Sequence, residues 1–217
     1  PSAMRIIRSF VRREGRMTTG QRNAFTQLWP QLGIDTQNTL LDLDAVFKRQ
    51  APRILEIGFG NGGALLSMAQ QHPENDYIGI EVHRPGVGSL MRLLGENQIN
   101  NVRVISEDAV QVLKDMIPNE SLDALHLFFP DPWHKKRHHK RRIVQAAFVD
   151  QVADKLKPNG VFHIATDWED YAVYMMEVMS ANKRFVNIAG ENLYSSRPDN
   201  RPLTKFEQRG QRLGHQV

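Results

Sequence analysis

The 217-residue chain has no cysteine and no apolar run long enough to cross a membrane. Without cysteine it can form neither disulfides nor cysteine-ligated zinc sites, which suits a reducing cytosol. A membrane-spanning helix needs about 18 or more consecutive apolar residues. The opening residues also show no signal-peptide pattern. The sequence therefore predicts a water-soluble, cytoplasmic protein.

The composition indicates one globular domain. Hydrophobic residues make up 41% and charged residues 24%, which argues against disorder. The length suits a single hydrophobic core. We expect residues 1–52 to form a basic arm and a helix packed on the domain, and residues 53–217 to form the main domain.

From residue 53 onward, short β-rich runs alternate with helical periodicity. The expected strands are 53–57, 76–82, 102–106, 122–129 and 160–165. The expected helices are 62–72, 84–98, 109–116, 143–157 and 168–182, with another around 18–29. A weak strand is expected at 185–188, followed by a polar loop. Five β–α units in a row predict an α/β fold: a doubly wound, mostly parallel sheet with helices on both faces.

The helix expected at 143–157 shows the clearest periodicity. Val144, Phe148, Val152 and Leu156 recur every four residues. The segment 157–160 (Lys-Pro-Asn-Gly) is expected to end this helix.

A glycine-rich turn follows the first expected strand. Gly58, Gly60 and Gly63 fit the dinucleotide-binding pattern, in which glycine lets the backbone approach a ligand closely. Glu81 ends the second strand, where a carboxylate can accept both ribose hydroxyls. At this point NAD and S-adenosyl-L-methionine (AdoMet) are equal candidates.

Charge separates the two candidates. Glu56 lies two residues before Gly58, and no Lys or Arg occurs from Glu56 to Asp76. Two like charges about 4 Å apart cost about 4 kcal/mol at an effective dielectric constant near 20. Glu56 would therefore repel a pyrophosphate and attract the sulfonium and ammonium groups of AdoMet. Asp108 after the third strand can bind the adenine amino group, or it can simply cap the next helix.

The fourth strand ends in Pro130-Asp131-Pro132-Trp133. The prolines restrict the backbone and direct the Asp131 carboxylate outward, toward the methyl donor. Asp131 could then accept hydrogen bonds from a nucleobase while Trp133 stacks on it. The alternative is an Asx-Pro turn anchored by a buried tryptophan.

Positive charge is concentrated in two segments. Residues 132–149 carry six Lys or Arg and no acid, and residues 1–16 carry five Arg and one Glu. Such confinement points to a polyanionic partner, RNA in this reading, although a solvated charged face is the alternative. His134, His138 and His139 lie in the first segment without cysteine or acid, so no metal site is expected there.

Five segments together resemble one family. They are Glu56–Gly60, Gly79–His83, Phe129–Lys135, Thr166–Trp168 and Thr204–Gly210. In this order they are similar to the bacterial tRNA (guanine-N7-)-methyltransferases, and the similarity runs over nearly the whole chain. The resemblance implies a Rossmann-like class I AdoMet-dependent enzyme that methylates N7 of a guanine in the variable loop of tRNA.

The resemblance also assigns roles by position. It places Glu56, Gly58, Gly60, Glu81, Asp108 and Asp131 at the AdoMet site, with Asp131 also acting on the guanine. It assigns substrate binding to Lys135, Asp167, Thr204, Lys205, Phe206 and Glu207. It assigns RNA contacts to Arg137, His138, His139, Lys140, Arg141 and Arg142. Asp167 has an alternative, because Thr166 and Glu169 have the spacing of a helix capping box.

The family continues beyond the Leu213-Gly214-His215 segment into an apolar strand, whereas the sequence printed here ends at Val217. The sheet position beside residues 160–165 is therefore left open.

Three other functions compete. A nicotinamide oxidoreductase is disfavoured by Glu56. A non-catalytic RNA-binding protein would not need carboxylates around a glycine turn. A small-molecule methyltransferase is disfavoured by the acid-free basic segment.

Overall fold

The computed structural model describes residues 15–195 and 203–210 and has an α/β fold built on one seven-stranded sheet. The strand order is β3-β2-β1-β4-β5-β7-β6, and all pairings are parallel except those of β7. The strands are β1 (Arg53–Ile57), β2 (Asp76–Ile80), β3 (Val102–Ile105), β4 (Leu122–Phe128), β5 (Leu156–Ala165), β6 (Phe185–Asn187) and β7 (Leu203–Gln208).

Within the described ranges there are seven α-helices and one 3₁₀ helix. They are α1 (Thr19–Leu32), α2 (Leu43–Phe47), α3 (Gly63–Gln71), α4 (Arg84–Glu96), α5 (Ala109–Asp115), η1 (Lys136–Arg141), α6 (Ala146–Lys155) and α7 (Glu169–Ala181). The predicted doubly wound, mostly parallel fold is confirmed.

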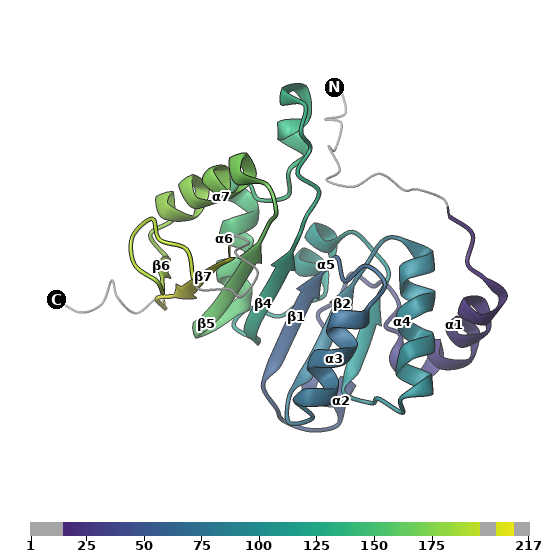
Figure 1. The fold of residues 1–217 in the computed structure, drawn as a ribbon. Helices are drawn as coiled ribbons and strands as arrows, with labels where there is room; N and C mark the ends of the chain where they lie inside the picture. The colour runs from purple at the N-terminus through teal and green to yellow at the C-terminus, as the bar shows by residue number, and fades with distance from the viewer. Residues whose placement is uncertain (1–14, 196–202, 211–217) are drawn as a thin grey trace, which may run out of the picture.

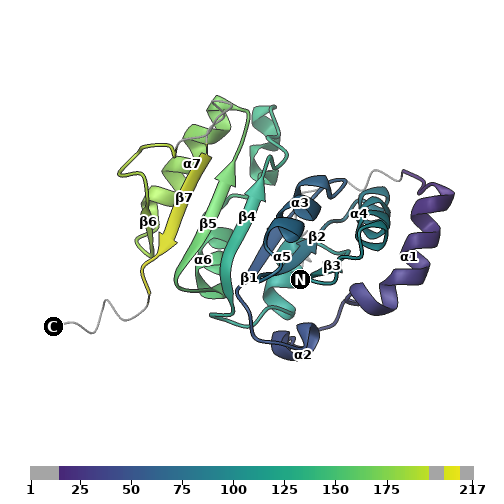
Figure 2. The same cartoon turned by 60° about the horizontal axis from the view of Figure 1, so that its bottom comes forward.

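Helices cover both faces of the sheet (Figures 1 and 2). One apolar cluster joins α1, α3 and α4 to β1–β3, and includes Leu65, Leu90 and Val104. The other joins α5, α6 and α7 to the opposite face, and includes Val152 and Phe162. Strand β1 is buried along its whole length, as expected for a central parallel strand.

The direction of winding reverses between β1 and β4, the two central strands. In open α/β sheets, ligands bind in the crevice at the carboxyl ends of the strands at this point. The glycine turn after β1 and the Asp131 loop after β4 both lie at this crevice.

The helix predicted at 143–157 is wrong at both ends. Helix α6 spans only Ala146–Lys155, and Leu156 already belongs to β5, where it pairs with Leu122. The segment 157–160 is an irregularity inside β5, because the next pair in register is Ala124 and Val161. Pairing of the two buried leucines outweighs the four-residue periodicity.

The polar loop expected after residue 188 contains strand β7, which lies antiparallel between β5 and β6. Thr204, Phe206 and Gln208 are buried, and Lys205 and Glu207 alternate with them on the other face. This two-residue alternation is typical of a strand, and it also fills the sheet position left open beside β5. The short elements α2 and η1 were not predicted either. Among the described residues, no helix is long and apolar enough to span a membrane.

Candidate AdoMet site and basic segment

The turn after β1 requires glycine. Gly58 and Gly60 have φ of 73° and 62°, a region that residues with a Cβ rarely adopt. A Cβ on Gly60 would meet no protein atom within 4 Å and would project into open space. Helix α4 packs directly on the turn, since a Cβ built on Gly86 would lie 2.3 Å from the carbonyl oxygen of Gly60.

Glu81 holds this turn to the end of β2. Its Oε1 accepts a hydrogen bond from the Gly60 N–H at 3.0 Å, and its Oε2 accepts from the N–H groups of Val82 at 2.8 Å and His83 at 3.2 Å. One carboxylate thus joins two strand ends. The sequence placed Glu81 beside a ligand ribose, but its link to the turn could not be read from spacing.

Glu56 lies in β1 and is 3% exposed. Burial, and to a lesser extent the nearby charge of Glu81, raise the pKa of Glu56 to about 7. Its register partner in β4 is His126, followed by His163 in β5 and Lys205 in β7. These four polar residues form one row across the same face of the sheet.

The two histidines in this row are neutral at pH 7. Burial lowers the pKa of His126 to about 3 and that of His163 to about 4. The neighbour of Glu56 in β4 is therefore uncharged, and a cation bound nearby would stabilise the ionised form of Glu56.

A cavity of about 350 Å³ lies where β1 and β4 end. Its lining includes Gly58, Gly60, Glu81 and Asp131, two of them acids, and no Lys or Arg from the part of the chain that the structure describes. This lining suits a cationic ligand and disfavours a pyrophosphate. The residues present therefore fit AdoMet.

A second cavity, of about 800 Å³, lies beside the ends of β2 and β3. Its lining includes Val82 and Glu107 together with Phe25 and Trp29 of α1, whose rings stack with centroids 4.8 Å apart. This contribution of α1 was not predicted from the sequence, although aromatic residues four positions apart lie on one helical face.

Asp108 occupies the N-cap position of α5, but its side chain makes no capping hydrogen bond. The alternative role of Asp108, capping α5 through its side chain, is therefore not observed. Asp108 follows β3 and is half-buried, on the side of the sheet end where the second cavity lies.

The loop after β4 has an unusual backbone on both sides of Asp131. Phe129 and Trp133 have φ of 54° and 44°, values that strain residues other than glycine. The Trp133 N–H donates to Asp131 Oδ1 at 2.9 Å, so the Asx turn forms. Asp131 nevertheless is exposed and lines the 350 Å³ cavity, so the turn and the site are compatible.

Trp133 is not an open stacking surface. The Arg141 guanidinium lies over its ring, 5.1 Å from the centroid, and the His138 ring contacts it edge-on at 5.7 Å. The more exposed indole at this end of the sheet belongs to Trp168, which is 48% exposed. Its ring meets the His134 ring edge-on, with centroids 3.9 Å apart. Sequence reasoning did not single out Trp168 as a stacking residue.

The basic segment forms a protrusion, η1, above the carboxyl ends of the strands (Figure 1). Lys135, Arg137 and Lys140 are exposed, whereas Arg141 and both histidines, His138 and His139, are half-buried. Because η1 ends at Arg141 and α6 begins only at Ala146, rather than at residue 143 as predicted, the protrusion and the next helix are separate elements.

Arg142 departs from the prediction that it contacts RNA. Its side chain is 3% exposed, and its guanidinium donates to the Pro132 carbonyl and to Asp170. The guanidinium is therefore already engaged inside the protein, and we correct its assignment.

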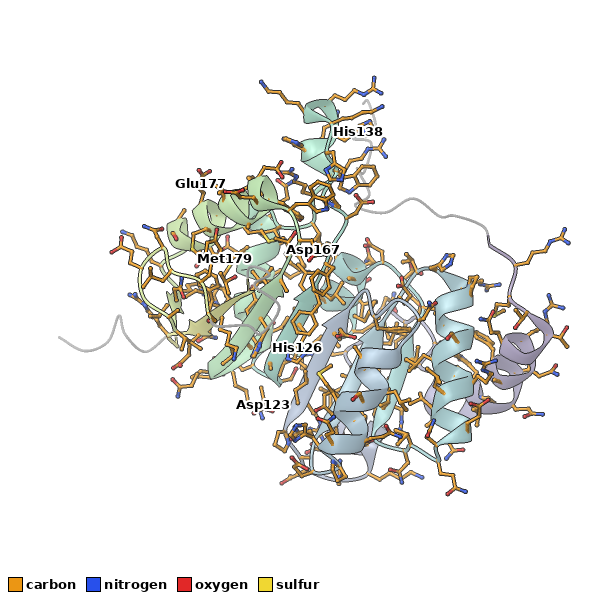
Figure 3. The ribbon with its side chains drawn as sticks, in the orientation of Figure 1. Asp123, His126, His138, Asp167, Glu177 and Met179 are labelled. Carbon is orange, nitrogen blue, oxygen red and sulfur yellow. The ribbon has the colours of Figure 1, made fainter. Side chains whose placement is uncertain are left out.

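Asp167 follows β5 and is exposed (Figure 3). Helix α7 begins at Glu169 with Trp168 at its N-cap, and Thr166 accepts a hydrogen bond from the Trp168 N–H at 3.2 Å. The alternative capping box between Thr166 and Glu169 does not form.

The four C-terminal candidates lie along β7 and differ in their burial and in their distance from the carboxyl end of β5. Phe206 is 2% exposed and packs in the core, so its assignment to substrate binding is corrected. Glu207 pairs with Val161, four residues or about 13 Å before the carboxyl end of β5, and also lies away from the crevice. Thr204 is buried beside Ile164 near that end, and Lys205 lies beside His163. Over residues 15–195 and 203–210, no three His, Asp or Glu form a group suited to a metal.

Comparison with known proteins agrees with this geometry. Residues 50–217 match a protein family described as "Putative methyltransferase". The aminoglycoside resistance methyltransferase NpmB1 shares the fold, with a TM-score of 0.56 and 14% identity over 80% of this chain and 95% of that one. An rRNA methylase from Streptococcus thermophilus matches with a TM-score of 0.51 and 15% identity, covering 73% and 87%. The chain is thus a class I AdoMet-dependent methyltransferase.

Sequence relatives narrow the class. A tRNA (guanine-N(7)-)-methyltransferase of Hydrogenovibrio crunogenus is 58% identical over 100% of this chain and 90% of its own length. One from Aeromonas hydrophila is 60% identical over 99% and 90%. The chain belongs to the tRNA (guanine-N(7)-)-methyltransferase family.

Substituting Gly60 tests the glycine turn. Gly60→Val places a branched side chain at positive φ and into the open space of the turn. We expect AdoMet binding to be lost by calorimetry while the circular dichroism spectrum stays native. Ala64→Val, at an exposed position in α3, is the control. Wild-type affinity in Gly60→Val would remove Gly60 from the site.

The pKa of Glu56 predicts how AdoMet affinity depends on pH. A bound cation favours the ionised carboxylate and lowers its pKa, so binding releases a proton. Affinity should then rise with pH below about 7, by up to tenfold per unit, and level off above it. Calorimetry between about pH 5.5 and 7.5 measures this rise. Glu56→Gln should bind more weakly and lack it, and an equal rise in the variant would contradict the assignment.

Proposed function

We propose that this protein transfers a methyl group from AdoMet to N7 of a guanine in the variable loop of tRNA. Family membership and the acidic cavity at the β1–β4 crevice support the donor and the reaction. The basic protrusion supports the RNA substrate. The observation that carries the proposal is that one segment, 128–142, runs from the cavity into the protrusion.

The continuity of this segment matters for the chemistry. Asp131 lines the cavity, and the exposed Lys135, Arg137 and Lys140 follow within nine residues. RNA phosphates held by the protrusion would bring a neighbouring nucleotide to the cavity. Phosphate contacts position a nucleic acid, and contacts to the base select it.

Guanine N7 carries a free lone pair at neutral pH, so the reaction needs no general base. AdoMet supplies the methyl group as an electrophile. The protein must hold N7 in line with the methyl carbon and the sulfur, which is mainly proximity and orientation. N7 lies on an edge that A-form RNA buries, so the target base must be unpaired or flipped out.

We assign the orientation of the guanine to Asp131, whose carboxylate can accept hydrogen bonds from the base N–H groups. Asp167, Lys135 and Thr204 are proposed to complete the substrate side, and Trp168 offers an exposed indole on which a base can stack. Glu56, Glu81 and Asp108 would hold AdoMet.

Nucleoside mass spectrometry tests the function directly. Unmodified tRNA is incubated with the protein and AdoMet, digested and analysed for 7-methylguanosine. We expect this nucleoside to appear, and fragment mapping should place it in the variable loop. A different methylated nucleoside, or methylation of small molecules alone, would overturn the proposal.

Asp131→Asn tests the orientation of the base. The amide keeps the size of the side chain but replaces one acceptor oxygen with a donor, so the single-turnover rate should fall on the order of 100-fold. The dissociation constant for tRNA, measured by filter binding, should change much less. A rate within a few-fold of wild type would mean that Asp131 is only a turn former.

The combined change Arg137→Ala and Lys140→Ala tests the protrusion. Loss of two phosphate contacts should weaken tRNA binding and reduce the slope of log K against log salt by roughly one to two units. AdoMet affinity should not change. Lys114→Ala with Lys183→Ala, which removes two exposed lysines elsewhere on the surface, is the matched control. If both double variants give the same plot of log K against log salt as the wild type, η1 is only a solvated face.

A further inference from the structure

Arg142 is the last basic residue of the segment 132–149, but its side chain is buried in the protein. Its Nε donates to the Pro132 carbonyl at 2.7 Å, and its Nη2 donates to Asp170 Oδ2 at 3.0 Å. The guanidinium also lies over the rings of Tyr171 and Tyr174, 4.6 and 5.4 Å from their centroids. Its side chain is 3% exposed, unlike those of Arg137 and Lys140.

These contacts join two segments that carry proposed site residues. Pro132 directly follows Asp131 in the loop after β4. Asp170 and Tyr171 lie in the first turn of α7, directly after Asp167 and Trp168. Two other contacts join these segments: the Phe129 N–H donates to the Ala165 carbonyl at 2.8 Å at the base of the loop, and the rings of His134 and Trp168 meet with centroids 3.9 Å apart. Arg142 therefore connects the far side of the Asp131 loop to α7.

The chemistry of this contact requires arginine. A buried cation is costly unless hydrogen bonds and charge partners compensate it. The planar guanidinium donates along its edge to a carbonyl and a carboxylate while it lies over aromatic rings. A lysine ammonium is a point charge and cannot make both kinds of contact in this geometry.

The loop needs such an anchor. Phe129 and Trp133 both have positive φ, a strained conformation that persists only when the surroundings hold it. Loss of the Pro132 contact would free the loop beyond Asp131 to relax. The carboxylate would then be displaced relative to the cavity, and small displacements in an active site cost much of the rate.

We propose that Arg142 is a positioning residue for methyl transfer, which locks the Asp131 loop onto the start of α7, and that it makes no contact with RNA phosphate. The catalytic part of this inference rests on the proposed function. Asp170 is its partner in the same role.

Arg142→Lys is the decisive variant, because it keeps the positive charge and removes the geometry. We expect its single-turnover rate at saturating AdoMet and tRNA to fall on the order of 10- to 100-fold. The salt slope of tRNA binding and the affinity for AdoMet should match wild type. Asp170→Asn, at a more exposed position, should lower the same rate less, and the double variant should lose no more than Arg142→Lys alone.

Arg184→Lys is the matched control. Arg184 forms an ion pair with Asp154 at 2.9 Å, at the end of α6 remote from the crevice, and its loss of geometry should leave the rate unchanged. A wild-type single-turnover rate in Arg142→Lys would overturn the proposal. A further variant, Arg142→Met, removes the charge. The proposal would also fall if this variant reduced the salt slope of tRNA binding and left the rate at saturating AdoMet and tRNA unchanged. A rate loss fully matched by a lower fraction of AdoMet-binding protein would also overturn it, since that is a loss of fold.

Hydrogen exchange separates this inference from the proposed function. In the absence of substrate, Arg142→Lys should speed hydrogen exchange at two places. One is the Trp133 amide, which donates a hydrogen bond to Asp131, and the other is the first turn of α7. Unchanged exchange would show that no anchor exists. If wild-type protein fails to methylate tRNA while the exchange difference is observed, the anchor stands and the proposed function falls.

Discussion

The site depends on a turn that must leave a fully buried central strand and enter a helix within five residues. Positive φ at Gly58 and Gly60 makes this path possible. Helix α4 packs so close to the turn that position 86 has no room for a side chain. Glu81 then ties the turn to the end of β2 through three N–H groups. Among the described residues, the cavity at this crevice is lined by the glycine turn, by apolar side chains and by two carboxylates, without a basic side chain.

The second half of the site depends on the same edge of the sheet. The strained loop after β4 faces the glycine turn across the switch in winding, and its basic continuation rises above the crevice (Figure 3). The acidic cavity and the basic protrusion are thus products of neighbouring strand ends. This separation of charge suits an enzyme that brings a cationic methyl donor and a polyanionic substrate together.

Much of this could be predicted from the sequence because alternating periodicity and glycine turns are local signals. Strand β1 and the acids at the ends of three strands were found that way. The rest depends on contacts between distant residues. Burial of Arg142 against two tyrosines, or pairing of Leu156 with Leu122, leaves no local pattern, and a basic run gives no sign of which arginine points inward. The strand at 203–208 did have a two-residue alternation, but turn-forming residues around it obscured the signal.

The central claim is that the carboxylates at the β1–β4 crevice select a cationic methyl donor over a dinucleotide, although the glycine pattern alone fits both. Parallel calorimetric titrations of the wild-type protein with AdoMet and with NADH test this most directly. The account predicts one saturable site for AdoMet and no measurable binding of NADH. Binding of NADH as tight as that of AdoMet would contradict it.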